Sequence, residues 1–129
     1  MPHAATLKVL IVDDQYSVRQ MIRLALEEIG VRNILESENG REAFDKAVSQ
    51  PLNLIISDFN MPEMDGLSLL RAVRSHQTVR KLPFILLTGR GDRDLVVKAA
   101  QSGVNNYVVK PFTNAVLREK IEQVMGKLS

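Results

Sequence analysis

The chain alternates between short apolar runs and segments in which apolar residues return every three or four positions. Four runs rich in aliphatic and β-branched residues predict strands buried on both faces, at residues 7–12, 52–57, 83–88 and 107–109. The stretch 33–37 is a further predicted strand, second in chain order. All of these runs are far too short to cross a bilayer, so we expect no membrane insertion.

Amphipathic helices are predicted between and after these strands. In the first, apolar residues share one face at spacings of three and four: Val18, Met21, Ile22, Ala25, Leu26 and Ile29. Similar stripes predict four more helices, around residues 43–48, 67–73, 95–100 and 117–125. Gly30 and Gly103 stand where the carboxyl ends of helices need a left-handed residue, and Thr113 can cap the last helix.

Five consecutive strand–helix units predict the α/β class, with a parallel sheet and helices on both of its faces. The length of 129 residues leaves room for one domain, so we expect a single domain over residues 1–129 with its core at about 6–127. In open sheets of this kind, ligands bind beyond the carboxyl ends of the strands. The residues that follow each strand are therefore the first candidates for function.

The composition narrows the possible classes of protein. Hydrophobic residues make up 45% of the chain and charged residues 25%, as in ordinary globular proteins. Cysteine is absent, which excludes disulfides, thiolate metal sites and cysteine nucleophiles and favours a cytoplasmic location. The formal net charge is +2 and the 17 Lys and Arg residues are spread along the chain, so we expect no nucleic acid among its partners.

Polar residues follow the predicted strands at positions that should converge on one edge of the sheet. Asp13 and Asp14 follow the first strand, Asp58 the third, Thr88 closes the fourth and Lys110 follows the fifth. Three carboxylates in one cleft repel one another unless a cation is present, and hard oxygen ligands suit Mg²⁺. An ammonium and a hydroxyl beside them can stabilise a phosphoryl group, which a carboxylate can accept as nucleophile.

Four longer motifs carry a resemblance to a known family. They are VDDQ at 12–15, SDFNMPEMDG at 57–66, LLTG at 86–89 and YVVKPFT at 107–113. In these motifs, and over essentially its whole length, the chain resembles the receiver domains of two-component response regulators, above all the single-domain chemotaxis regulators. The resemblance implies a flavodoxin-like fold with five parallel strands in the order 2-1-3-4-5 and five helices.

The resemblance also implies roles for the clustered residues. Asp58 would be the phosphoacceptor, supplied by a histidine kinase or a small phosphodonor. Mg²⁺ would be held by Asp14, Asp58 and the backbone carbonyl of Asn60, with Asp13 binding it directly or through water. Lys110 would pair with a phosphoryl oxygen, and its peptide bond to Pro111 would be cis.

The expected output is a change of surface rather than turnover of a substrate. Thr88 would swing toward the phosphoryl group and Tyr107 would turn inward, which alters the fourth helix, fifth strand and fifth helix. We expect no enzyme activity beyond the chain's own phosphorylation and dephosphorylation. We expect a monomer whose partners are a kinase, a downstream protein such as a flagellar motor switch, and in some settings a phosphatase. Val97 falls off the buried stripe of its helix and could contact the downstream partner.

The sequence differs at two positions from the usual pattern of single-domain chemotaxis regulators. Arg90 stands where single-domain chemotaxis regulators often carry an acid, and Phe59 replaces a Trp that can follow the phosphoacceptor; we expect Arg90 to affect the lifetime of the phosphoryl group. An FMN-binding carrier of the same fold is disfavoured by the aspartates after the first strand. A phosphatase with an aspartyl nucleophile lacks an evident second acid. A receiver in a pathway other than chemotaxis stays open.

Overall fold

The computed structural model describes residues 3–89 and 92–128. Its elements follow in the order η1 (Ala4–Thr6), β1 (Lys8–Val12), α1 (Tyr16–Ile29), β2 (Asn33–Ser37), α2 (Gly40–Ser49), β3 (Leu54–Asp58), α3 (Gly66–Ser75), β4 (Phe84–Thr88), α4 (Arg93–Gln101), β5 (Asn106–Val109) and α5 (Asn114–Met125). All five predicted strands and all five predicted helices are present. Over the described ranges, none of these helices has the length and apolar character needed to span a membrane.

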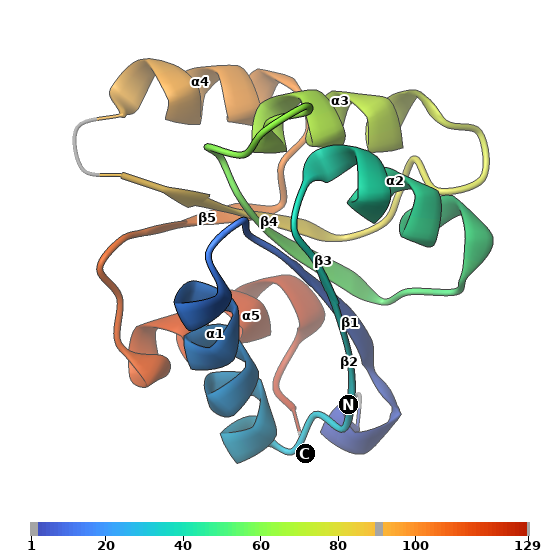
Figure 1. Ribbon diagram of the computed structural model, residues 1–129. Helices are drawn as coiled ribbons and strands as arrows, with labels where there is room; N and C mark the ends of the chain where they lie inside the picture. Colours follow the sequence, from blue (N-terminus) through green and yellow to red (C-terminus); the bar gives the residue numbers. More distant parts are fainter. Residues whose placement is uncertain (1–2, 90–91, 129) are drawn as a thin grey trace.

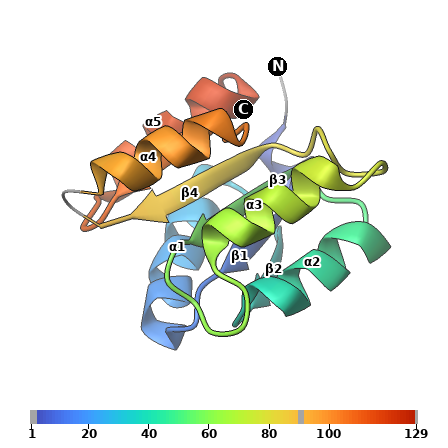
Figure 2. The ribbon, with the colours of Figure 1, turned by 90° about the horizontal axis from the view of Figure 1, so that it is seen from above.

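The strands form one parallel sheet in the order β2-β1-β3-β4-β5, which confirms the order inferred from the resemblance. Helices cover both faces: α1 and α5 lie on one side, and α2, α3 and α4 lie on the other (Figure 1). Within the second group, α2 and α3 lie side by side in both views (Figure 1, Figure 2). The α/β class and the two helical layers are therefore as predicted.

The period of two along each strand divides the core into two layers. In β1, Val9 and Ile11 pack with the residues of α1 and α5, whereas Leu10 and Val12 pack with those of α2 and α3. All four side chains are fully buried. Burial of one such side chain stabilises the fold by about 1.5–3 kcal/mol, so the central strands are held firmly on both faces. This makes the carboxyl ends of β1 and β3 a rigid place for functional groups.

The helix ends follow the predicted signals. Gly30 and Gly103 have φ values of 106° and 90°, and the Thr113 side chain accepts a hydrogen bond from the Val116 N–H at 3.1 Å. Met21, predicted to lie on the buried face of α1, is 49% exposed. It lies at one edge of the apolar stripe of α1, whereas Arg19, at the other edge, is buried.

The first residues of α2 and α3 are glycines that lie too close to neighbouring backbone for any side chain. A Cβ atom at Gly66 would collide with the carbonyl oxygen of Asp58, and one at Gly40 would collide with that of Met64. The Gly66 N–H also donates to the Phe59 carbonyl at 2.8 Å. These contacts hold the backbone of Asp58 and Phe59 against the start of α3.

We predict that Gly66→Ala lowers the free energy of unfolding by about 1–3 kcal/mol, because the added methyl group forces the β3–α3 loop away from Asp58. Urea denaturation followed by circular dichroism measures the loss. Ser68→Ala, an exposed change two residues further along α3, serves as control and should stay within about 0.5 kcal/mol of the wild type. Equal stabilities of the two variants would contradict this account of the loop.

Candidate functional site

Three acidic side chains meet at the carboxyl edge of the sheet. Asp13 and Asp14 follow β1 directly, and Asp58 is the last residue of β3. Each offers one carboxylate oxygen that lies within 4.8 Å of the other two. Asp13 is fully buried and Asp58 is 8% exposed, whereas Asp14 faces solvent. The predicted convergence of the three acids is therefore present in the structure.

Lys110 joins this cluster from the segment after β5. Its Nζ lies 2.8 Å from Oδ1 of Asp58 and donates a hydrogen bond to Oδ2 of Asp13 at 3.3 Å. The backbone N–H of Lys110 donates to the Thr88 carbonyl at 2.7 Å, which anchors the segment beside β4. The peptide bond from Lys110 to Pro111 is cis, as the resemblance implied. One ammonium thus bridges two carboxylates that come from different strands.

The electrostatics of the cluster leave negative charge only partly compensated. Burial is the main influence on Asp13 and raises the pKa of its carboxyl; the charge of Asp58 raises it further, while the Gln15 N–H and Lys110 oppose the change. Burial alone would lower the pKa of Lys110, but its hydrogen bond to Asp58 and the charges of both acids raise it. The ammonium stays charged, yet its attraction does not fully offset the effect of burial on the pKa of Asp13.

The donor set fits a hard divalent cation. Carboxylate oxygens at close range are the ligands that Mg²⁺ prefers, and three carboxylates share a single ammonium, which leaves an excess of negative charge for a cation to offset. Asn60, the fourth predicted ligand, lies two residues beyond Asp58 in an exposed stretch of the β3–α3 loop. The residues present are therefore compatible with the magnesium site that the sequence predicts.

Thr88 closes β4 next to this cluster and carries an unused hydroxyl. It is 1% exposed, and its Oγ1 makes no hydrogen bond within the described ranges. In the sheet register Asp58 pairs with Leu87, so Thr88 stands one residue beyond the level of Asp58 on the neighbouring strand. A buried hydroxyl without a partner costs about 1–3 kcal/mol, and it is a ready donor for a new acceptor in the site.

A pocket that opens to the surface lies beside Thr88. This cavity of about 350 Å³ lies between α4 and β5, lined among others by Thr88, Val96, Val97, Tyr107 and Val109. Tyr107 is half-buried, and the Lys120 ammonium lies 5.3 Å from the centroid of its ring. Val97 is 54% exposed, as the sequence predicted. Thr88 and the expected switch tyrosine therefore line one space.

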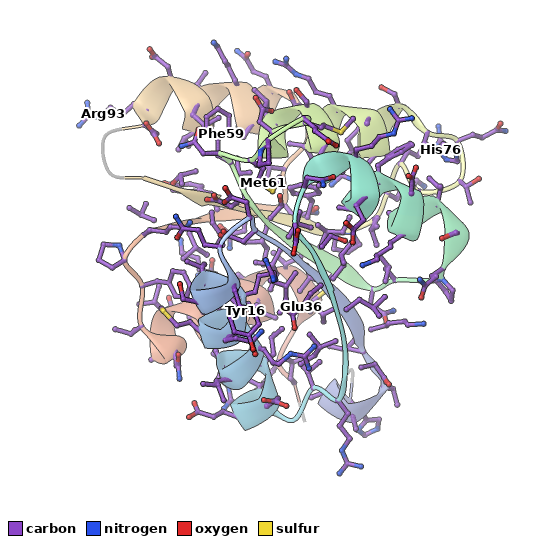
Figure 3. All side chains as sticks on the ribbon, in the orientation of Figure 1. Tyr16, Glu36, Phe59, Met61, His76 and Arg93 are labelled. Carbon is purple, nitrogen blue, oxygen red and sulfur yellow. The ribbon has the colours of Figure 1, made fainter. Side chains whose placement is uncertain are left out.

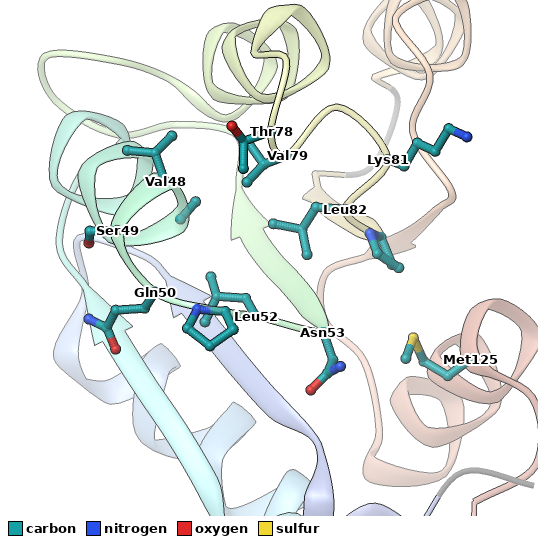
Figure 4. A pocket seen from close by; sticks show the side chains of 13 residues that line it. Val48, Ser49, Gln50, Leu52, Asn53, Thr78, Val79, Lys81, Leu82 and Met125 are labelled. Carbon is teal, nitrogen blue, oxygen red and sulfur yellow. The ribbon is translucent and has the colours of Figure 1, made fainter.

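A second, larger cavity of about 650 Å³ lies away from the acids, at the amino ends of the strands (Figure 4). Its walls come from the α2–β3 and α3–β4 connections and include Leu52, Val79 and Leu82. None of the predicted site residues lines it.

The sequence singled out Arg90 and Phe59 but not Arg19. Arg90, predicted to affect phosphoryl lifetime, lies outside the described residues, while Phe59 is half-buried beside Asp58. Sequence reasoning missed Arg19, a buried arginine that bonds to the backbone of Asp13. A signal was available, because Arg19 precedes Ile22 by three positions and Leu26 by seven, which places it on the buried stripe of α1.

Comparison with known proteins gives a consistent result over nearly the whole chain. Residues 9–122 match the family model of the response regulator receiver domain. The probable chemotaxis protein CheY of Rhizobium etli is 45% identical over 128 residues, which cover 99% of each chain. Chemotaxis protein CheY1 of Helicobacter pylori is 43% identical over 121 residues, covering 93% of this chain and 98% of that one.

Solved structures agree in fold. The chemotaxis response regulator CheY4 of Vibrio cholerae superposes with a TM-score of 0.84 at 34% identity, covering 92% of this chain and 98% of that one. The receiver domain of the sensor histidine kinase PA1611 of Pseudomonas aeruginosa gives a TM-score of 0.84 at 28% identity, over 94% and 98% of the two chains. That structure holds a magnesium ion in its active site cleft.

We predict that Thr88→Val increases the free energy of unfolding of the unphosphorylated protein by about 1 kcal/mol, because a methyl group of similar size replaces a buried hydroxyl that has no partner. Thermal and urea unfolding measure the change. Thr78→Val, at an exposed position, is the control and should change stability by less than about 0.5 kcal/mol. A clear loss of stability in Thr88→Val would show that the hydroxyl has a structural partner.

Proposed function

Because the chain belongs to the response regulator receiver family, whose members are phosphorylation-activated signalling domains, we propose that Asp58 is its phosphoacceptor and Mg²⁺ its cofactor. The observation that carries the proposal is the surroundings of Asp58. Its carboxylate is almost buried, bonded to Lys110 at 2.8 Å and flanked by two further acids. This combination suits a nucleophile that must hold a doubly charged product.

The proposed reaction is a transfer of one phosphoryl group. An oxygen of Asp58 attacks the phosphorus of a phosphohistidine on a histidine kinase, or of a small donor such as acetyl phosphate. As the new oxygen–phosphorus bond forms, the bond to the donor's nitrogen or oxygen breaks and its electron pair leaves with the donor. Lys110 stabilises the negative charge of the transferred group, and the chain thereby assists its own phosphorylation and later hydrolysis.

The acids and one backbone group form the proposed metal site. Asp13, Asp14, Asp58 and the carbonyl of Asn60 would hold Mg²⁺, which supplies the positive charge that draws phosphoryl oxygens toward Asp58. Two arguments support this set. The carboxylate oxygens are already close together, and the three acids share one ammonium, so an added cation would offset the excess negative charge.

The proposed switch couples the site to the surface of α4, β5 and α5. Once a phosphoryl oxygen is present, the free hydroxyl of Thr88 can donate to it, and the Tyr107 ring can move into the cavity beside α4. The phosphoryl group favours this arrangement because it offers Thr88 an acceptor that the resting site lacks. Val97 and Val109, which are 54% and 40% exposed, lie on the surface that would change.

Chemotaxis is the pathway we propose for this output. The relatives from Rhizobium etli and Helicobacter pylori that match along nearly their full length carry the name chemotaxis protein. A partner at the flagellar motor switch would read the surface of α4, β5 and α5, and a histidine kinase would supply the phosphoryl group. A receiver in another phosphorelay would use the same site chemistry with a different partner.

We predict that the wild-type chain, incubated with acetyl phosphate and Mg²⁺, gains the mass of one phosphoryl group, and that Asp58→Asn gains none. Chelation of Mg²⁺ with EDTA should abolish the gain. Intact-protein mass spectrometry measures both. Asp45→Asn removes an exposed acid on α2 and should be labelled like the wild type. Equal labelling of wild type and Asp58→Asn would overturn the assignment of the acceptor.

We also predict that phosphorylation tightens binding to the motor switch protein of the same organism, and that Val97→Lys weakens this binding by roughly 10-fold without changing phosphorylation. Titration in the presence and absence of acetyl phosphate measures the affinities. Leu24→Lys, an exposed apolar position on α1, is the matched control. If Leu24→Lys weakens binding as much as Val97→Lys, the output surface lies elsewhere.

A further inference from the structure

Arg19 is a buried guanidinium in the second turn of α1. The residue is only 7% exposed, although charged side chains are almost never buried unless they are paired. Nothing in the proposed phosphoryl transfer uses it. A group that is costly to bury and has no part in the chemistry calls for a structural or positioning role.

The contacts of Arg19 connect three parts of the molecule. Its NH1 group donates to the backbone carbonyl of Asp13 at 2.8 Å, and its Nε donates to Oε1 of Glu36 on β2 at 2.9 Å. The Tyr16 ring lies 5.6 Å from the guanidinium carbon. Glu36 is held in turn by Arg23, whose Nε lies 2.9 Å from its other oxygen; Tyr16 and Glu36 are labelled in Figure 3.

This bonding fixes the peptide that joins the first two acids. The N–H of Asp13 donates to the Ser37 carbonyl at 3.1 Å, and the carbonyl of Asp13 accepts from Arg19. Both sides of the Asp13 backbone are thus tied down, so the plane of the peptide bond to Asp14 is set. Because the following residue starts from this plane, its side-chain direction depends on it.

Asp14 needs such support more than its neighbours do. Asp13 and Asp58 are buried, and Lys110 bonds to both, whereas Asp14 is exposed and its carboxylate makes no hydrogen bond or ion pair within the described ranges. Only the backbone therefore keeps its oxygen near the other two acids.

We infer that Arg19 is a positioning residue of the magnesium site, which aims the Asp14 carboxylate by holding the Asp13–Asp14 peptide against β2. The inference rests on the proposed function, because it concerns the site to which that proposal assigns Mg²⁺. Groups that orient metal ligands through hydrogen bonds typically affect metal affinity by 10- to 100-fold when they are removed.

Because Arg19 is positively charged, a loss of its charge and a loss of its positioning role should change the affinity for Mg²⁺ in opposite directions. A guanidinium near a cation site repels the cation, so removal of its charge alone should tighten the binding of Mg²⁺. Loss of positioning should weaken binding. The sign of the change therefore separates the two effects.

Arg23 offers a matched control on the same helix. It donates to the same glutamate at the same 2.9 Å distance as Arg19, but no bond joins it to Asp13. Arg23→Met removes one charge and one ion pair with Glu36, as Arg19→Met does, and leaves the Asp13 carbonyl bonded. The second ion pair of Arg19, with the exposed Glu38, is long at 4.0 Å and contributes little.

The test is Mg²⁺ binding to the unphosphorylated chain, measured by isothermal titration calorimetry. Arg19→Met should bind Mg²⁺ roughly 10-fold more weakly than the wild type, while Arg23→Met should bind it equally or slightly more tightly. The amide resonance of Asp14 in the metal-free protein should shift in Arg19→Met and stay in place in Arg23→Met. Arg19→Lys keeps the charge but cannot reach both acceptors with one planar fork, so it should also weaken binding, and it replaces the Met variant if that variant fails to fold.

Unchanged or tighter Mg²⁺ binding by the folded Arg19 variants would overturn the inference and leave the proposed function intact. Equal weakening by Arg19→Met and Arg23→Met would also overturn it, because a shared loss would come from the Glu36 network. Absence of Mg²⁺ binding to the wild type would instead refute the proposed metal site itself.

Discussion

The charge balance between two buried carboxylates and one ammonium is the constraint on which this molecule depends. Asp13 and Asp58 sit at the ends of neighbouring strands, and Lys110 is within 3.3 Å of both. In a partly desolvated setting such charges interact far more strongly than in water. Without Lys110 the two acids would repel across the edge of the sheet. With it, part of the repulsion is offset, although three carboxylates still share one ammonium.

The parallel sheet imposes this crowding on the acids. Residues that follow neighbouring parallel strands emerge at one edge, so the chain can bring Asp13, Asp58 and Lys110 together across nearly a hundred residues of sequence. The strands β1 and β3 are buried on both faces, and the close contact of Gly66 with the Asp58 carbonyl limits movement of the end of β3. The strands cannot separate to relieve the repulsion between the acids. Cations such as Lys110 reduce it instead.

The sequence predicts most of this arrangement because its signals are local and strong. Apolar runs located the strands to within two residues, and the acids after them identified the edge. The two errors in α1 concern residues at the edges of its apolar stripe, where the helical period does not decide burial by itself. Arg19 is buried because Glu36 and the Asp13 carbonyl accept its hydrogen bonds, and these partners come from other parts of the chain. Met21, at the other edge, stays exposed. The pocket beside Tyr107 could not be predicted from the sequence either, because its shape depends on how α4, β4 and β5 pack against one another.

The site joins a rigid side to a deformable one, and this asymmetry suits a switch. On the β1 and β3 side, main-chain bonds and the Arg19–Glu36 pair hold the acids in place, so a bound ligand meets fixed charges. On the β4 and β5 side, the Thr88 hydroxyl has no partner in the described structure and a cavity of about 350 Å³ adjoins it. Asp13 and Asp58 are buried and paired with Lys110, so a new charge in the site has little room to displace them. In the proposed switch its effect falls on Thr88 instead, where a new hydrogen bond is available and the neighbouring pocket allows side chains to rearrange.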